Sequence, residues 1–404
     1  MRRQIHCVKN PHAGQEGEPG CRYNFTQMRK TIPGGMKVAE FLRRYWQKRP
    51  LFVPKALPGW SQAFDRRALE ALAAREDVES RLVRFAGRKW TLDHGPFSRR
   101  ELRALPERGW SLLVQGVDLL SLRNAAMLSI FDFIPRARLD DIMVSFAPPG
   151  AGVGPHFDSY DVFLVQGHGT RRWRISSQKD LSLIPGAPLR ILSRFVPEQE
   201  WIVEPGDMLY LPPHIAHEGV AISDSITISV GFRAPSAQEL AVGYLEYLQD
   251  ATDRKGMYAD ADLATQRHPG EIGRAMLDRM ARMLSGLSLS RSNLIGFAGT
   301  SLTEPKPHVV FARVDTPPTP ARFAREAQRR GLVLSPASRM LFCGSRFFIN
   351  GEEMEVEPAH RSAMRTLADT RFLVQSSVTP GIASAIHPWF CAGYVLLAEG
   401  TDDG

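Results

Sequence analysis

The sequence contains no long apolar run, and it is poor in cysteine. A helix that crosses a bilayer needs about 18 or more mostly apolar residues in a row, and no such stretch occurs among the 404 residues, so we expect no membrane partner. The basic start MRRQIHCVKN is not followed by an apolar segment, which argues against a secretory signal. Four cysteines are too few for a disulfide framework in this length, so we expect a reducing, cytoplasmic location.

The chain also lacks a strongly basic domain, although its net charge is +8. Residues 1–35 hold six basic and two acidic residues, and residues 306–404 hold eleven and ten, so the long middle part carries only +3. A domain that binds DNA usually gathers its basic residues on one face. We therefore expect no direct sequence-specific DNA binding.

The first two segments differ sharply in their pattern of apolar residues. Residues 1–35 are rich in glycine, proline and charge and have no hydrophobic period, which predicts a disordered N-terminal extension. The next segment, 36–235, begins with a helical pattern in MKVAEFLRRYW and changes at about residue 141 to short alternating strands such as DIMVSFA and SITISVGF. Closely spaced strands of this kind are typical of a β-sandwich or barrel.

The C-terminal half follows two other patterns. Residues 236–305 contain apolar stripes at helical spacing over 237–251 and 270–287, which indicate a core or a face for a partner helix. Residues 306–404 begin with a proline-rich linker and then mix a helix (ARFAREAQRR) with strands (RMLFCGSRFFINGEE). The chain as a whole is therefore predicted to be an α+β protein of several domains.

A His-x-Asp pair in the segment GPHFDSYDVFLVQ is the first candidate for chemistry. His156 and Asp158 are two positions apart, so in an extended strand both side chains point to the same face. A second histidine, His217, follows 59 residues after Asp158 in GDMLYLPPHIAHEG. Two imidazoles and one carboxylate on one face of an octahedron leave three positions open, which suits Fe(II) that binds a bidentate co-substrate and O2. The combination predicts a metal site inside a barrel.

If the bidentate co-substrate is 2-oxoglutarate, the site also needs a cation that binds its distal carboxylate. In TRRWRI, strand alternation sends Arg171, Trp173 and Ile175 to one face, and the two apolar residues favour the interior. A buried arginine is costly unless a carboxylate pairs with it, and 2-oxoglutarate supplies one. Ser225, eight residues after His217, can donate its hydroxyl to the same carboxylate.

At these residues the sequence resembles the JmjC/cupin-type ribosomal oxygenases, and especially the bacterial ribosomal protein arginine hydroxylases. The resemblance is carried by DDIMVSFAPPGAGVGPHFDSYDVFLVQGHGTRRWRI and PGDMLYLPPHIAHEGVA, and it extends to SRMLFCGSRFFINGEE. It implies a catalytic domain with a double-stranded β-helix (cupin/JmjC jelly roll) over 36–235, a helical dimerisation region over 236–305 and a winged-helix domain over 306–404. A homodimer is the expected assembly.

The resemblance also implies a reaction and a role for each site residue. The expected activity is Fe(II)-, 2-oxoglutarate- and O2-dependent hydroxylation at Cβ of an arginine in a large-subunit ribosomal protein, the sixteenth of the L series. The resemblance implies that iron is bound by His156, Asp158 and His217. It implies that 2-oxoglutarate is bound by Arg171 and Ser225, and that the substrate guanidinium is recognised by Asp141 and Tyr160.

Two histidines depart from the family pattern, and other functions stay open. His168 stands in the turn of QGHGT, and His214 lies close to His217 in PPHIAH; we expect both to be turn or loop residues. A histidinyl hydroxylase is an alternative within the class, although a carboxylate at Asp141 favours a cationic arginine. A non-catalytic, ribosome-associated metal-binding cupin is an alternative from another class, against which Arg171 argues. A small-molecule cupin enzyme fits the additional domains less well.

Overall fold

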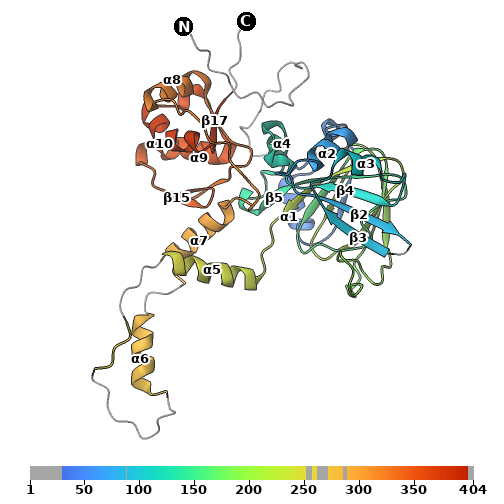
Figure 1. Ribbon diagram of the computed structural model, residues 1–404, viewed down its shortest axis with the longest axis horizontal. Coiled ribbons are helices and arrows are strands. Elements are labelled where there is room, and N and C mark those ends of the chain that lie inside the picture. Colours follow the sequence, from blue (N-terminus) through green and yellow to red (C-terminus); the bar gives the residue numbers. More distant parts are fainter. Residues whose placement is uncertain (1–29, 88, 252–256, 262–271, 285–288, 399–404) are drawn as a thin grey trace.

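The structure is a computed structural model that describes residues 30–87, 89–251, 257–261, 272–284 and 289–398. Figure 1 shows a large β-rich domain beside a smaller C-terminal α+β domain, with helices linking the two along one side. The fold class is α+β, as the sequence predicts. No helix within these residues is both long and apolar enough to cross a membrane.

The β-rich domain is built on an eight-stranded, antiparallel sheet. Its strands lie in the order β1-β9-β6-β11-β5-β4-β2-β3. Most neighbours, such as β9 with β1 and β11 with β5, are distant in sequence, as in a jelly roll. The strands are β1 (Leu51–Val53), β2 (Ser80–Ala86), β3 (Lys89–His94), β4 (Trp110–Val114), β5 (Leu139–Ala147), β6 (Val162–His168), β9 (Met208–Leu211) and β11 (Ser225–Phe232).

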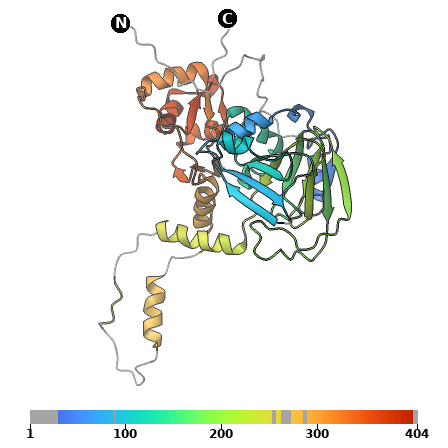
Figure 2. The same ribbon diagram turned by 45° about the vertical axis from the view of Figure 1, so that its right-hand side comes forward.

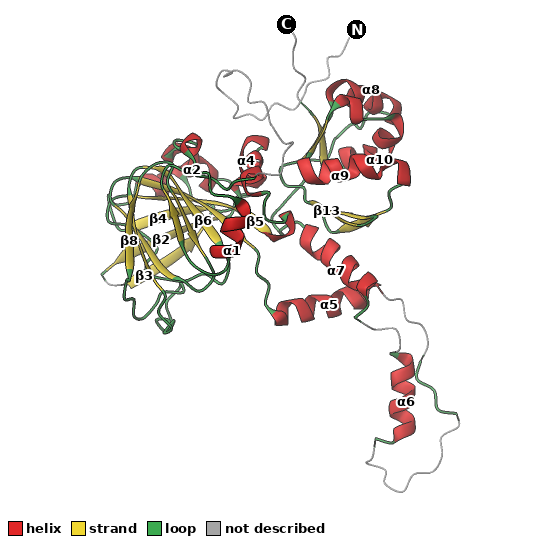
Figure 3. Cartoon of the chain, turned by 180° about the vertical axis from the view of Figure 1, so that it is seen from behind, coloured by secondary structure: helices red, strands yellow, loops and turns green. Residues whose placement is uncertain are grey.

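A second sheet, in the order β10-β7-β8, faces the first. Its strands are β7 (Arg171–Ser176), β8 (Gln199–Val203) and β10 (Ala216–Ala221). Strand β6 shows why the two sheets pack together: Phe163 and Val165 enter the main core, while Val162 and Leu164 join a second core with Trp173. Because successive side chains point to opposite faces, a strand buried on both faces reads as a continuous apolar run. Figures 2 and 3 show the strands from two further sides.

Short helices cover the outer side of the main sheet. Three of them begin at capping residues: Asp65 accepts a bond from the Ala68 amide at 2.7 Å, Ser98 and Glu101 form a capping box, and Ser121 caps the third. Trp60 and Phe131 fill the core beneath them and are both buried. The helices of this domain are α1 (Val38–Arg44), α2 (Arg66–Ala73), α3 (Arg99–Arg103) and α4 (Leu122–Met127).

The packed structure begins before residue 36. The predicted disordered extension lies outside the described residues as far as residue 29. From residue 30 onward the chain is in contact with the domain: Ile32 is 2% exposed in the main core, and its amide donates to Met36 O at 2.8 Å.

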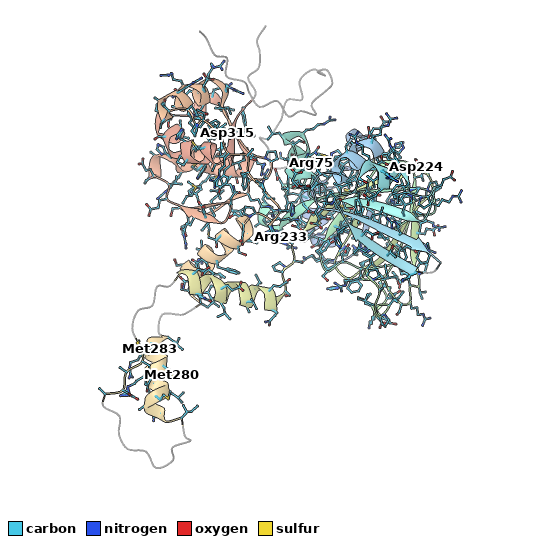
Figure 4. All side chains as sticks on the ribbon, in the orientation of Figure 1. Arg75, Asp224, Arg233, Met280, Met283 and Asp315 are labelled. Atoms are coloured by element: carbon cyan, nitrogen blue, oxygen red, sulfur yellow. The ribbon has the colours of Figure 1, made fainter. Side chains whose placement is uncertain are left out.

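Three helices connect the β-rich domain to the C-terminal domain: α5 (Ala237–Ala251), α6 (Arg274–Met283) and α7 (Arg291–Thr303). Phe297 of α7 packs against Tyr244 of α5 at 5.6 Å between ring centroids. Among the described residues, the predicted apolar stripe of α6 joins no hydrophobic core, because Met276 and Met280 are 43% and 42% exposed. Figure 4 shows Met280 and Met283 on this helix, away from both domains. The interpretation of this stripe as a partner face, and with it the dimerisation region, stays a prediction.

The C-terminal domain has its own core and two three-stranded sheets, β16-β12-β17 and β13-β14-β15. It contacts the β-rich domain through Arg339, whose guanidinium donates to the carbonyls of Leu139 and Asp140 at the start of β5. Its elements are α8 (Pro320–Arg330), β12 (Leu332–Leu334), β13 (Met340–Cys343), β14 (Arg346–Ile349), β15 (Glu352–Met354), α9 (Arg361–Thr370), β16 (Phe372–Leu373), α10 (Pro380–Cys391) and β17 (Val395–Leu397).

Candidate metal centre and substrate cavity

His156, Asp158 and His217 lie together, with one ligand atom of each within 4.8 Å of the others. The His-x-Asp pair is not in a regular strand as expected, but in the segment between β5 and β6. A single antiparallel bridge joins this segment to β10: the His156 amide donates to His217 O at 2.9 Å, and the return bond is 2.8 Å. The bridge keeps the backbone extended, so the expected same-face geometry is preserved.

Both imidazoles are oriented by the backbone. Nδ1 of His217 lies 2.9 Å from Ile215 O, and Nδ1 of His156 lies 2.9 Å from Gly154 O. We assign a proton to each Nδ1, since only a donor can bond a carbonyl, and this leaves each Nε2 lone pair for a metal. Burial and, secondarily, the neighbouring His156 lower the pKa of His217 to about 4, so its ring is neutral at physiological pH.

Arg171 points into the same cavity from β7 and is 5% exposed. Its Nε donates to Ser225 Oγ at 3.2 Å, whereas its Nη2 finds no hydrogen-bond partner among the described residues. Burial lowers the pKa of Arg171 to about 10, which still leaves the guanidinium charged at neutral pH. A buried cation with an unpaired N–H is costly, and a bidentate carboxylate is the ligand that removes this cost.

Ser225 is fully buried and has a neighbour that sequence reasoning missed. Its Oγ accepts bonds from Arg171 and from Gln166 Nε2 at 2.9 Å, so its own O–H remains available to a bound carboxylate. Gln166 in turn accepts from Thr227 at 3.2 Å. The signal for Gln166 in the sequence is a polar residue inside the apolar strand VFLVQG.

A single cavity of about 570 Å³ joins the three potential metal ligands and Arg171 to a second end, where the carboxylate of Asp141 lies. Asp141, on β5, is 3% exposed and accepts bonds from Gln115 Nε2 on both oxygens, at 2.9 and 2.8 Å. Lys306, from the linker that precedes α8, adds an ion pair at 2.6 Å. Tyr160 lines the same cavity and is 42% exposed. The tyrosine therefore leaves part of its ring accessible beside Asp141.

The two extra histidines lie outside this group. His168 is exposed at the end of β6, and His214 is exposed with a positive φ of 64°. Neither belongs to the cluster of potential metal ligands found among the described residues. The positive φ explains why His214 cannot follow the extended bridge that places His217, because a left-handed residue turns the chain.

The double-stranded β-helix and the residues that line its cavity are those of a JmjC oxygenase. A model of the JmjC domain matches residues 126–240, and a model of the ROXA-like winged helix matches residues 290–393. The chain is 34% identical over 332 residues to the ribosomal protein uL16 3-hydroxylase of Escherichia coli strain K12, covering 81% of this chain and 88% of that protein. The chain therefore belongs to the ribosomal oxygenase family. Its catalytic domain has the fold of the JmjC 2-oxoglutarate oxygenases.

Two further comparisons agree with this assignment. A probable ribosomal oxygenase of Haemophilus influenzae is 42% identical over 209 residues, which are 50% of this chain and 51% of that protein. The solved structure of YcfD, a ribosomal oxygenase from Escherichia coli, in complex with cobalt and 2-oxoglutarate superimposes with a TM-score of 0.77 at 32% identity, covering 89% of this chain and 97% of that chain. The protein is thus a JmjC enzyme of the type that uses a metal and 2-oxoglutarate.

Proposed function

We propose that this protein hydroxylates Cβ of an arginine side chain in the large-subunit ribosomal protein uL16, using Fe(II), 2-oxoglutarate and O2. The observation that carries the proposal is the single cavity that contains three potential metal ligands, a buried arginine with an unpaired nitrogen, and a buried carboxylate. Each feature corresponds to one component of the reaction: metal, co-substrate and cationic substrate. The Escherichia coli relative is named ribosomal protein uL16 3-hydroxylase, which supports uL16 as the target.

His156, Asp158 and His217 would hold the metal. Two neutral imidazole nitrogens and one carboxylate fit Fe(II), and this donor set leaves coordination positions for the co-substrate. When bound, the iron supplies the activation of O2 that a C–H hydroxylation requires. The contribution of the chain is to keep both Nε2 atoms unprotonated and aimed at one point through the carbonyls of Gly154 and Ile215.

Arg171 and Ser225 would bind the distal carboxylate of 2-oxoglutarate. The unpaired Nη2 and the free Ser225 hydroxyl offer two donors to an anion in a site from which water is largely excluded. Charge-assisted bonds in such a site are strong, because few solvent molecules screen them. Pairing also removes the cost of the isolated buried charge, so co-substrate binding stabilises the fold.

Asp141 and Tyr160 would position the substrate side chain. A buried carboxylate attracts a guanidinium, and the partly exposed ring of Tyr160 can stack on its planar face. This favours arginine over the histidinyl alternative, since a histidine is mostly neutral at physiological pH. Arg171 argues against a non-catalytic binding module, because a barrel without a co-substrate gains nothing from an unpaired buried cation.

Mass spectrometry of uL16 tests the proposal directly. We expect purified uL16 to gain one oxygen atom on an arginine after incubation with the protein, Fe(II), 2-oxoglutarate and O2, together with release of succinate. Asp158→Ala should give no product, whereas His168→Ala, which removes an exposed histidine outside the cluster, should act like the wild type. Oxygen on a histidine would replace the substrate assignment, and full metal loading without any product would favour a binding module.

Dimerisation and a cytoplasmic location remain part of the proposal. The exposed apolar side chains of α5 and α6, including Leu245 at 66% and Met276 at 43%, provide a surface that a second copy could cover. Light scattering coupled to size exclusion should give twice the chain mass. Aspartate substitutions at Leu245 and Met276 should shift the protein to the monomer.

A further inference from the structure

Lys306 enters the catalytic cavity from outside the catalytic domain. It lies in the linker between α7 and α8, and its side chain is 22% exposed. Its Nζ is 2.6 Å from Asp141 Oδ2 and 3.3 Å from Asp140 Oδ1. The ammonium thus occupies the carboxylate end of the cavity, at the place where the proposed function puts the substrate cation.

The bonds around Asp141 leave no room for a two-bond guanidinium pair. A carboxylate offers about four acceptor positions. Gln115 uses one on each oxygen, and Lys306 uses a third. A guanidinium binds a carboxylate best through two parallel N–H bonds that need both oxygens. Such a pair can form on Asp141 only after the lysine has moved away.

The ion pair between Lys306 and Asp141 is favourable, but it is not the only counter-charge of the two aspartates. Burial lowers the pKa of Lys306, but the attraction of Asp141 and Asp140 outweighs it, and the pKa lies above its ordinary value. Asp140 is also 3.6 Å from Arg233, at the junction of the domains (Figure 4), so the aspartate pair keeps a cation when the lysine leaves. The linker continues to an exposed segment, in which Val310 is 84% exposed.

Resting on the proposed function, we propose that Lys306 is a resident cation of the substrate subsite, which the substrate guanidinium must displace. The exchange replaces one ammonium contact by a two-bond guanidinium pair, and the released lysine regains water. A substrate lysine would gain nothing comparable, because it would exchange one ammonium for another. Lys306 therefore acts as a specificity-determining residue that favours arginine and raises the apparent dissociation constant for every cationic side chain.

Removal of the competitor gives the first test. The binding of an arginine-containing uL16 peptide is measured by calorimetry with the metal- and 2-oxoglutarate-loaded protein, without O2, so that no turnover occurs. We expect Lys306→Met to lower the dissociation constant by about tenfold. Lys306→Arg, which keeps a competing cation, should not lower it. Lys179→Met removes a lysine from an exposed loop after β7 and controls for the loss of one positive charge.

The accessibility of the amine gives a second test that is independent of any variant. An amine-acylating reagent is applied to the wild type with and without the peptide, and modification is quantified by peptide mass spectrometry. We expect Lys306 to react slowly in the free protein and severalfold faster with saturating peptide, while Lys179 reacts equally in both states. A Lys306 that stays protected in the complex would show that it remains on Asp141, which contradicts displacement.

The two tests separate this inference from the proposed function. If the wild type hydroxylates the peptide but Lys306→Met binds it equally or more weakly, the lysine merely neutralises or orients Asp141 and the inference is wrong. If the wild type neither binds nor hydroxylates any arginine-containing uL16 peptide, the proposed substrate is wrong, and the inference about Lys306 is wrong as well.

Discussion

Among single residues, Arg171 shows most directly how function can oppose stability. Its side chain is buried, and among the described residues one of its nitrogens has no hydrogen-bond partner and no carboxylate forms an ion pair with it. Its strand neighbour Trp173 keeps this side of β7 apolar, so water cannot fully solvate the charge. The free protein therefore bears a cost that a bound dicarboxylate would remove.

Substitution of Arg171 by methionine should separate the two effects. We expect Arg171→Met to weaken 2-oxoglutarate binding by about a hundredfold, since a charge-assisted pair of this kind contributes roughly 2–5 kcal/mol. The melting temperature of the free protein should stay the same or rise. Calorimetry and thermal unfolding with and without 2-oxoglutarate measure both quantities. Arg172→Met, on the opposite face of the same strand, is the control, and undiminished 2-oxoglutarate affinity in Arg171→Met would contradict the assignment.

The histidines allow an equally direct comparison. His217 is 2% exposed and belongs to the potential ligand group, whereas His168 and His214 are exposed outside it. His217→Ala should weaken Co(II) binding by at least about a hundredfold, because it removes a ligand and not only its orienting partner. His168→Ala should leave binding unchanged. An anaerobic titration followed by the Co(II) absorption spectrum decides, and equal affinities of the two variants would rule out His217 as a ligand.

At the level of elements, strand β10 couples packing to the metal centre. It carries His217 and, two residues later, Gly219, which lies against the ring of Trp173. A Cβ added at Gly219 would approach the Trp173 ring to 2.7 Å, closer than real side chains come. The glycine thus lets the indole pack directly on the backbone of β10, and this contact holds the strand at the distance that places His217.

Gly219→Ala should consequently disturb both stability and metal binding. Overpacking of this kind costs about 1–3 kcal/mol of unfolding free energy, and we expect a several-fold loss of Co(II) affinity because β10 must shift. Urea unfolding and the same Co(II) titration provide the measurements. Gly59→Ala, with nothing within 4 Å of its added Cβ, should be near neutral in both. Wild-type metal affinity in a destabilised Gly219→Ala would show that β10 does not transmit the strain.

For the molecule as a whole, the junction of the catalytic and C-terminal domains carries buried charges beside the end of the cavity that holds Asp141. Asp118 lies there, 3% exposed, and accepts the Ile142 amide at 2.8 Å. Arg339 of the winged helix lines the same junction. Burial and the nearby Asp141 raise the pKa of Asp118 to about 6 from its ordinary value of 3.8. The free energy of unfolding is therefore linked to the protonation of Asp118.

The sign of this linkage gives a prediction. Between pH 4 and 6 the folded protein keeps the Asp118 proton while the unfolded chain has released it, so the free energy of unfolding falls as pH rises through this window. The contribution is on the order of 2–3 kcal/mol. Asp118→Asn keeps the acceptor for Ile142 and cannot ionise. Its stability relative to the wild type, measured by urea unfolding, should increase from pH 4.5 to pH 7; a difference that is independent of pH would contradict the linkage.

The sequence by itself determined those features that depend on the period of the chain. Alternation by two placed His156 with Asp158 and turned Arg171 inward beside Trp173, because which face a strand residue takes is a local property. The helical stripe of α5 was likewise readable, and its predicted range 237–251 coincides with the helix. The resemblance to a family supplied the domain order, which no local pattern could.

Tertiary structure alone decided the surroundings of the Asp141 carboxylate. Gln115 and Lys306 lie 26 and 165 residues from Asp141 in the chain, and they meet it only because β4 pairs with β5 and the linker crosses the cavity. The same holds for the bridge that replaces the expected strand at His156 and for Gln166 beneath Ser225. Such contacts arise from how whole sheets and domains pack, and a one-dimensional pattern contains no information on which distant polar groups will share a low-dielectric cavity.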